Sequence, residues 1–417
     1  MRYRSISRKQ SQERGQTIAL VALTIVTLLA MAALAIDVVT LYVAKGEVQR
    51  AADAAALVAA KAFVDSGVTS DPANASLQTL AENMANAGIT AILPQNKVAG
   101  AAPALVGTPT FDFSTARPGN PQVTVSLQRT GLPIFFARIW RSAAATVTAS
   151  AKAEAYNPAN SQTKTGNYIP IAPKCEKPLL VTNQDPAPGH GGVPFVSATT
   201  GAVTLTGTYP AGVIGETITL SSACSPGNKP CSPPLSPGPG KYVPAIVTPP
   251  ASGANLCPSC IGSSDFEQSI ECCDVKQYSC GGTTTATVDM LLPGARGKAE
   301  DGLQCLIHSP SRDTLDTTNF LAGSGPPEIT AHTGAFPGSL VTTSNSIATL
   351  PIFDGSITGN QVKVVGFLQV FINNTTGGAP GTFSATVLNV IGCGNNPGGN
   401  SVQAGSTSPI PVRLISQ

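Results

Sequence analysis

An uncharged apolar run from Ile18 to Ile36 constrains this chain more than any other feature of its sequence. A helix of that length rises about 28 Å, which nearly matches the roughly 30 Å hydrocarbon layer of a bilayer. A core helix this long would normally carry a polar face, and this run has none. We therefore expect a transmembrane helix over residues 16–37. Its large lipid-facing side chains would be Ile18, Leu20, Val21, Leu23, Ile25, Val26, Leu28, Leu29, Leu34 and Ile36.

Basic residues gather on the N-terminal side of this run. Arg2, Arg4, Arg8, Lys9 and Arg14 precede it, and few basic residues follow it closely. Because Lys and Arg favour the cytoplasmic side, residues 1–15 are expected in the cytosol and most of the chain outside it. The small residues at 33–35 also fit signal-peptide cleavage. The length of the run and the helical sequence beyond it favour an uncleaved anchor in the inner membrane.

The sequence stays helical in character from Val38 to Phe63. Apolar residues there recur at steps of three and four, which is the pattern of a contact seam along one helix face. The seam consists of Leu41, Ala44, Val48, Ala51, Ala55, Val58 and Ala62. Its partner could be a sheet of the same domain, which the shortness of the run favours. It could also be another helix of a self-associated form.

This N-terminal region resembles a known family. The residues that carry the resemblance are Arg14-Gly15-Gln16, Ile36-Asp37, Leu41-Tyr42, Lys45 and the block from Val48 to Leu57. Their order and spacing are similar to the N-terminal segment of TadG-like proteins, which belong to the assembly group of the Flp (tight adherence) pilus. Weaker similarity runs on to about residue 156. The resemblance implies a bacterial, membrane-anchored accessory component that works with other Tad/Flp assembly proteins. In that pilus-related function we expect the seam to contact membrane partners.

The sequence departs from pilins at one position that distinguishes a pilus subunit from an assembly factor. Prepilin peptidases cut after a glycine and usually require a glutamate five residues further on. Gly15 is followed at that distance by Leu20. We therefore expect an assembly factor and not a polymerising pilus subunit.

The predicted fold class is α+β. Residues 38–156 are expected to continue the anchor into a membrane-proximal, pilin-like domain with a long helix and a small sheet. A second helix should follow Asp71-Pro72, with Gly88 as its C-terminal cap. Strand patterns occur at residues 110–114, 122–128 and 143–155, and a short helix is expected at 132–140.

Beyond this domain, residues 157–192 contain six prolines and are expected to form an extended linker. Residues 193–417 should form a β-rich distal region. Its clearest strands are predicted at 347–353, 361–373 and 382–391, with shorter candidates at 203–207 and 216–220. The segment 225–250 is so rich in Pro, Ser and Gly that we expect a loop there.

Ten cysteines occur in the part of the chain expected outside the cytoplasm. An even number in an oxidising compartment favours disulfides that staple the distal domain, with a connectivity that the sequence leaves open. The candidates are Cys175, Cys224, Cys231, Cys257, Cys260, Cys272, Cys273, Cys280, Cys305 and Cys393. Two alternatives remain. Cys257 and Cys260 have the spacing of a redox dithiol, and with Cys272 they have a spacing that zinc could use.

Other residues give weaker signals for chemistry. Asp354-Gly355-Ser356 resembles the metal site of von Willebrand A domains, but the turn and strand predicted after it favour a hairpin. His190, His308 and His332 are scattered and lack a catalytic constellation. Charged residues make up 12% of the chain and the net charge is +2, which argues against a nucleic-acid surface. We therefore expect no enzymatic activity, no cofactor and no metal.

Two other functions compete with pilus assembly. One is a secreted or surface-exposed adhesin without a pilus role. The other is an extracytoplasmic thiol oxidoreductase that uses Cys257 and Cys260.

Overall fold

The computed structural model describes most of the 417 residues of the chain. The described residues are 9–70, 72–113, 120–134, 136, 144–155, 171–172, 176–199, 201–223, 237–245, 264–272, 286–287, 295–322, 327–332, 337–341, 344–357, 361–375, 381–393, 400–401 and 412–415.

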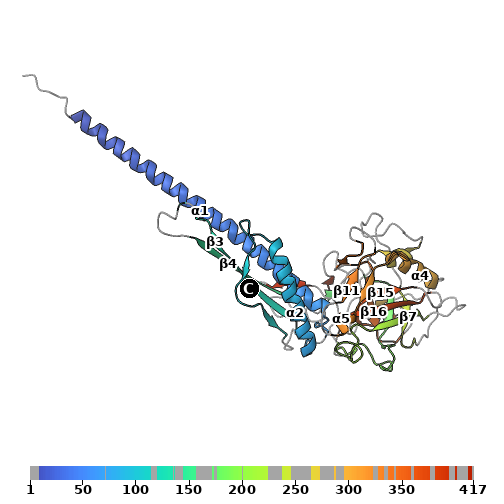
Figure 1. Ribbon diagram of the computed structural model, residues 1–417. Coiled ribbons are helices and arrows are strands. Elements are labelled where there is room, and N and C mark those ends of the chain that lie inside the picture. The colour runs from blue at the N-terminus through green and yellow to red at the C-terminus, as the bar shows by residue number, and fades with distance from the viewer. Residues whose placement is uncertain are drawn as a thin grey trace, which may run out of the picture.

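One long helix, α1 (Lys9–Asp65), contains both the apolar run and the alanine-rich segment that follows it. Figure 1 shows its N-terminal part extending away from the folded body, while its C-terminal part lies against a sheet. The helix continues unbroken because residues 18–63 contain no proline and a single glycine, Gly46. The helix predicted over residues 38–63 is confirmed.

The C-terminal part of α1 packs on an antiparallel sheet. The strands are β1 (Ala104–Leu105), β2 (Thr110–Asp112), β3 (Gln122–Leu132), β4 (Ala145–Ala155) and β18 (Val412–Ile415). Their order is β1-β3-β4-β18, and β2 also pairs with β3. Val123, Val125 and Leu127 alternate along β3 and are fully buried in the same core as the α1 alanines. Alternation places these side chains on one face of the sheet, as the period-two pattern predicted.

A second helix, α2 (Ala75–Ile92), packs beside α1 and is followed by a short 3-10 helix, η1 (Leu93–Gln95). The side chain of Asn74 caps α2 by accepting hydrogen bonds from the backbone of Ser76 and Leu77. The prediction that Gly88 ends this helix is wrong. A Cβ at Gly88 would lie 2.7 Å from Cγ1 of Val58, so the glycine lets α2 approach α1 closely. The predicted cap residue, Asp71, lies outside the described residues.

The last described strand of the chain belongs to the membrane-proximal sheet. β18 pairs antiparallel with β4, from Val412 opposite Ala155 to Ile415 opposite Lys152. The prediction of one distal region over residues 193–417 is therefore wrong at its end. The distal region is inserted between β4 and β18. A four-residue edge strand gives little sequence signal, and its partner lies more than two hundred residues earlier.

The distal region is built on a closed six-stranded barrel. Its strands are β6 (Leu179–Thr182), β7 (Thr217–Ser222), β8 (Lys241–Pro244), β13 (Ile347–Phe353), β15 (Val364–Asn374) and β16 (Phe383–Gly392). The order around the barrel is β13-β15-β16-β7-β8-β6. The β6–β13 and β7–β8 pairs are parallel, and the other pairs are antiparallel. The strands predicted at 216–220, 347–353, 361–373 and 382–391 correspond to barrel strands.

Three sequence predictions differ from the barrel. Residues 176–192 are not an extended linker, because they contain β6 and the buried residues Glu176 and Lys177. The segment 225–250 contains β8. Residues 203–207 form no strand, and Val203 makes only an isolated bridge with Val196. The two missed strands are four residues long and lie among prolines, so neither composition nor alternation marks them.

Smaller elements surround the barrel. Helices α3 (Asp265–Glu271) and α4 (Ala295–Leu306) contribute Phe266, Ile270 and Leu303 to its core. A further short helix is α5 (Thr318–Leu321). The remaining described strands form three small sheets. One contains β10 (Thr314–Asp316), β11 (Glu328–Thr330) and β12 (Leu340–Val341). The other two are the pair β9 (Ala286–Thr287) with β14 (Gln361–Val362) and the pair β5 (Ile171–Ala172) with β17 (Asn400–Ser401).

The barrel is joined directly to the end of α1. The side-chain amide of Asn389 donates a 2.8 Å hydrogen bond to the carbonyl of Val64, and the hydroxyl of Ser70 donates one of 3.0 Å to the carbonyl of Val390. Leu80 of α2 packs into the barrel core, and Ile391 of β16 packs into the core under α1. The two regions therefore contact each other directly, and the chain also passes from one to the other twice.

Candidate functional site

The apolar run lies exposed on α1. The helix is long and apolar enough to cross a membrane, with a mean hydropathy of 2.7 in its most apolar window, and none of that window is buried against the rest of the protein. Leu20 is 64% exposed and Leu28 is 65% exposed. A core helix would bury such side chains, so this alternative is excluded for residues 18–36. A cleavable signal sequence near the N-terminus would meet the same criteria of length and hydropathy. The small residues of the candidate cleavage site, 33–35, lie within the uninterrupted helix α1.

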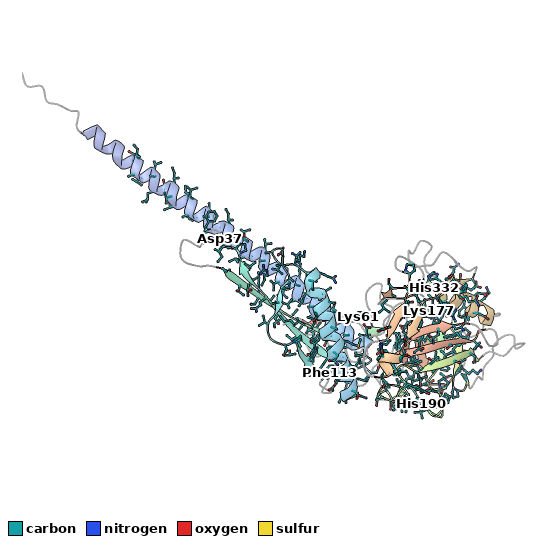
Figure 2. The ribbon with its side chains drawn as sticks, viewed as in Figure 1. Asp37, Lys61, Phe113, Lys177, His190 and His332 are labelled. Carbon is teal, nitrogen blue, oxygen red and sulfur yellow. The ribbon has the colours of Figure 1, made fainter. Side chains whose placement is uncertain are left out.

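Asp37 marks the end of the apolar run. Its side chain is 4% exposed, and its Oδ2 accepts a 2.9 Å hydrogen bond from the backbone amide of Phe136. Figure 2 shows Asp37 where α1 first meets the end of the small sheet. This contact joins the helix to the chain that follows β3. The sequence marked Asp37 only as part of the family pattern, and no periodicity revealed its partner.

The predicted seam faces the inside of the membrane-proximal domain. Ala44, Val48, Ala51, Ala55 and Ala62 are buried in one core with β3, β4 and α2. Leu41 and Val58 are partly buried. The sheet of the same domain is therefore the partner, as the shortness of the run favoured. The seam is not available for self-association or for membrane partners in this fold. The prediction that the seam contacts such partners is therefore wrong.

Polar residues beside the seam also reach the sheet. Gln49 donates a 3.2 Å hydrogen bond from Nε2 to the carbonyl of Ser150, and Lys45 donates from Nζ to the carbonyl of Thr148. These hydrogen bonds attach α1 to β4 in addition to the packing of the alanines.

Three cysteines lie in the described part of the chain, namely Cys272, Cys305 and Cys393, and each is disulfide-bonded. Cys175, Cys224, Cys231, Cys257, Cys260, Cys273 and Cys280 lie outside the described residues. The pairing stays a prediction, and so do the redox and zinc alternatives for Cys257 and Cys260.

The Asp354 segment forms a turn. β13 and β15 are antiparallel neighbours, and Oδ1 of Asp354 accepts a 2.9 Å hydrogen bond from the backbone amide of Ser356. Gly355 has a φ of +84°, which glycine adopts without strain. This is the hairpin that the sequence favoured over a von Willebrand-type metal site.

Two of the three histidines stand apart from any group of chemically reactive side chains in the described structure. His308 hydrogen-bonds Asn345, and the side chain of His332 lies at the surface. The third histidine, His190, is 9% exposed and belongs to a buried cluster. Figure 2 shows His190 at the edge of the distal region.

This cluster consists of Asp185, His190 and Glu216. Nδ1 of His190 lies 2.5 Å from Oδ2 of Asp185 and 3.3 Å from Oε2 of Glu216. Asp185 is fully buried and Glu216 is 1% exposed. The three potential ligand atoms lie within 4.8 Å of one another. The three histidines are scattered in the sequence, but the fold brings two carboxylates beside His190.

Burial and like charge shape the titration of the cluster. Burial and the neighbouring Asp185 carboxylate raise the pKa of Glu216 to about 9. Burial alone would lower the pKa of His190, but its hydrogen bonds to Pro210 and Asp185 and the charge of Asp185 raise it overall. The site therefore favours a positive charge or a proton between its acceptor atoms.

The sequence could not place these residues together. Asp185 and His190 fall in a proline- and glycine-rich segment interpreted as a linker, and Glu216 directly precedes a strand. They meet only because the barrel brings the 183–196 loop against the start of β7. A histidine flanked by two glycines was the one visible signal, and glycines of this kind occur in many surface turns.

Comparison with known proteins gives one family match. Residues 15–62 match the family described as "Putative Flp pilus-assembly TadE/G-like". The match covers the apolar run and most of the packed part of α1, and it confirms the TadG-like resemblance of the N-terminal segment. It supports a pilus-related role. No curated protein and no solved structure shows significant similarity to the chain.

Proposed function

We propose that this chain is a single-pass inner-membrane protein that serves as an accessory component of Flp/Tad pilus assembly and acts through protein contacts, not catalysis. The observation that carries the proposal is the coincidence of two findings on α1. The family match spans residues 15–62, and none of the most apolar part of the same helix is buried.

An uncleaved anchor fits the structure of α1. Cleavage after Ala35 would separate the apolar run from Asp37 and from the alanines that pack on the sheet within one continuous helix. The hydroxyls of Thr24 and Thr27 donate 2.8 Å hydrogen bonds to the carbonyls of Val21 and Thr24, so these polar groups are satisfied inside the helix. The run can then face lipid on all sides.

The charge distribution supports the orientation. Basic residues precede the apolar run, which favours a cytosolic N-terminus and an extracytoplasmic body. The disulfide bonds of Cys272, Cys305 and Cys393 suit the oxidising environment on that side. The barrel would be held outside the membrane at the far end of a continuous helix.

Partner contacts would use surfaces other than the seam. The seam is buried in the protein, so the exposed residues of the apolar run and the outer surface of the distal region remain for other Tad/Flp assembly proteins. Buried helix packing and barrel contacts would fix the orientation of these two surfaces relative to each other.

Genetic complementation in a bacterium that assembles Flp pili tests this function. A deletion strain should lose most surface pili and surface adherence, and the wild-type gene should restore both. A variant with Leu28→Arg should fail to complement, because it weakens the anchor, while Leu28→Met should complement fully. Normal pili and adherence in the deletion strain would contradict the assignment.

Two further outcomes would point to the competing functions. Normal pili with lost adherence would favour an adhesin. Loss of complementation with Cys257→Ser or Cys260→Ser, without loss of the protein, would favour thiol chemistry.

A further inference from the structure

We propose that Asp185, His190 and Glu216 bind one divalent transition-metal ion, and that Zn²⁺ is the ion their donor atoms fit best. The site lies on the barrel and is independent of the pilus-related role. It ties the 183–196 loop to the start of β7.

Glu216 carries a buried carboxyl group that lacks a hydrogen-bond partner. Both side-chain oxygens of Glu216 are buried and have no hydrogen-bond partner, and the carboxylate points toward Asp185 and His190. Among the described residues, His190 is the only ion-pair partner of Asp185 and Glu216. A buried carboxyl group without hydrogen bonds is costly, and a cation between the three groups would displace its proton and satisfy its oxygens.

A hydrogen bond from Nε2 orients the ring of His190 toward the carboxyl groups. Its Nε2 lies 3.1 Å from the carbonyl oxygen of Pro210, and only a protonated Nε2 can donate to that acceptor. Nδ1 faces the two carboxylates and would give up its own proton when a metal ion binds, while the bond from Nε2 to Pro210 is kept. Histidines that bind metals commonly donate their other ring N–H to a backbone carbonyl in this way, which fixes the ring orientation.

The distances between the donor atoms also suit zinc. Zinc bonds of 2.0–2.2 Å in a tetrahedral site place neighbouring ligand atoms about 3.4 Å apart. The separation of 3.3 Å between Nδ1 of His190 and Oε2 of Glu216 matches this value. The 2.5 Å contact between His190 and Asp185 is shorter, and ion entry would widen it by about 1 Å.

The loop that carries two ligands is held in place by its own hydrogen bonds. Oδ1 of Asp185 accepts a 2.8 Å bond from the amide of Ala187, which leaves Oδ2 for the cluster. Asn183 bonds both the amide and the carbonyl of Val196 across the loop. Gly189 and Gly191 have φ values of +98° and +65°, which let the chain turn sharply on either side of His190.

The donor set selects the class of ion. One imidazole nitrogen and two carboxylates suit zinc, whereas calcium and magnesium prefer oxygen ligands throughout. The His190 ring is 8% exposed and the neighbouring residues 188, 189 and 191 are exposed, so the site lies just beneath the surface. Water can therefore supply a fourth ligand.

The test uses the full-length protein in detergent, with its cysteines oxidised and metals removed by chelation. Zn²⁺ and Ca²⁺ are titrated separately by calorimetry, and the thermal midpoint of the barrel is followed in parallel. We expect about one equivalent of zinc, a raised midpoint with zinc, and no effect of calcium. Glu216→Gln should weaken zinc binding at least about 10-fold, whereas Glu267→Gln should leave it unchanged.

The control residue is matched to the test residue. Glu267 is also a buried carboxylate of the distal region, but it belongs to a capping box with Ser264, in which glutamine can replace glutamate. Equal zinc affinity in the wild type and Glu216→Gln, or no zinc binding by the wild type, would overturn the proposal.

A second measurement decides the matter if Glu216→Gln does not fold. A His308→Gln, His332→Gln double variant retains His190 as its single histidine. Co²⁺ bound to this variant should perturb the ¹⁵N signals of His190 and show no thiolate charge-transfer band. An unperturbed His190 signal, or a thiolate band, would place the metal elsewhere and refute the site.

Discussion

The two halves of α1 are both apolar, yet they meet different surroundings. In the first half, large side chains such as Leu20, Leu28 and Leu29 point outward around the helix and are more than half exposed. In the second half, small residues such as Ala51, Ala55 and Ala59 are buried against β3, β4 and α2. Side-chain size and the presence of an opposite polar face tell these halves apart, because close packing needs small residues on one side.

The largest effect should come from a charge placed in the packed half. Ala55→Asp buries an unpaired carboxylate at a position with no exposed surface, and we expect it to destabilise the membrane-proximal domain by more than about 4 kcal/mol. Thermal unfolding in detergent measures the change. Ala54→Asp is the matched control, because Ala54 is partly exposed on the neighbouring position of the helix. Equal midpoints for the two variants would show that Ala55 does not face a core.

A charge in the exposed half should act on the membrane and leave the fold intact. Leu28→Arg places a guanidinium near the middle of the apolar run and should raise the free energy of membrane insertion by about 3 kcal/mol. Carbonate extraction should release part of this variant from the membrane, while the distal region unfolds at an unchanged temperature. Leu28→Met should stay in the membrane fraction. A lowered unfolding temperature for Leu28→Arg would mean that this half also packs on protein.

The contact between α1 and α2 should tolerate no added volume at its narrowest point. Gly88→Leu would force Val58 and its neighbours apart, and we expect a loss of about 2 kcal/mol in the free energy of unfolding. Gly46→Ala is the counterpart on α1, where a Cβ would meet nothing within 4 Å. This change should stabilise the helix by up to about 1 kcal/mol. Chemical denaturation of both variants compares the two positions, and the same sign for both would contradict the close approach at Gly88.

The smallest effect should come from the exposed ion pair near the end of α1. Nζ of Lys61 lies 2.6 Å from Oδ2 of Asp65, and both side chains are substantially exposed. Lys61→Ala should change the free energy of unfolding by less than about 0.5 kcal/mol, because exposed pairs are screened by water and salt. A larger loss would indicate that this surface of the helix is covered in the assembled protein.

The sequence predicted the elements whose own residues carry a strong pattern. α1 was predictable because it has no proline and a sustained period, and β13, β15 and β16 because they are long and rich in β-branched residues. The closure of the barrel was not predictable. β6 and β8 are four residues long, mostly buried on both faces and placed among prolines.

The same physical reason separates the predicted from the unpredicted site residues. The apolar run is a property of consecutive residues, so its exposure could be foreseen. The Asp185, His190 and Glu216 cluster is a property of the closed barrel, which brings a loop and a strand together. The seam is an intermediate case. Its sequence pattern predicted that this face of the helix packs against a partner. Only the structure showed that the partner is the sheet of the same domain, which leaves the seam closed to other proteins.

The central claim is that residues 18–36 span the membrane as an uncleaved anchor with the folded body outside the cytoplasm. Proteinase K applied to intact spheroplasts tests it, with one epitope at the N-terminus and another at the C-terminus. We expect the C-terminal epitope to be lost while the N-terminal epitope persists on a small membrane-bound fragment. A C-terminal epitope that resists digestion until the membrane is opened, or a mature protein that begins after Ala35, would contradict it.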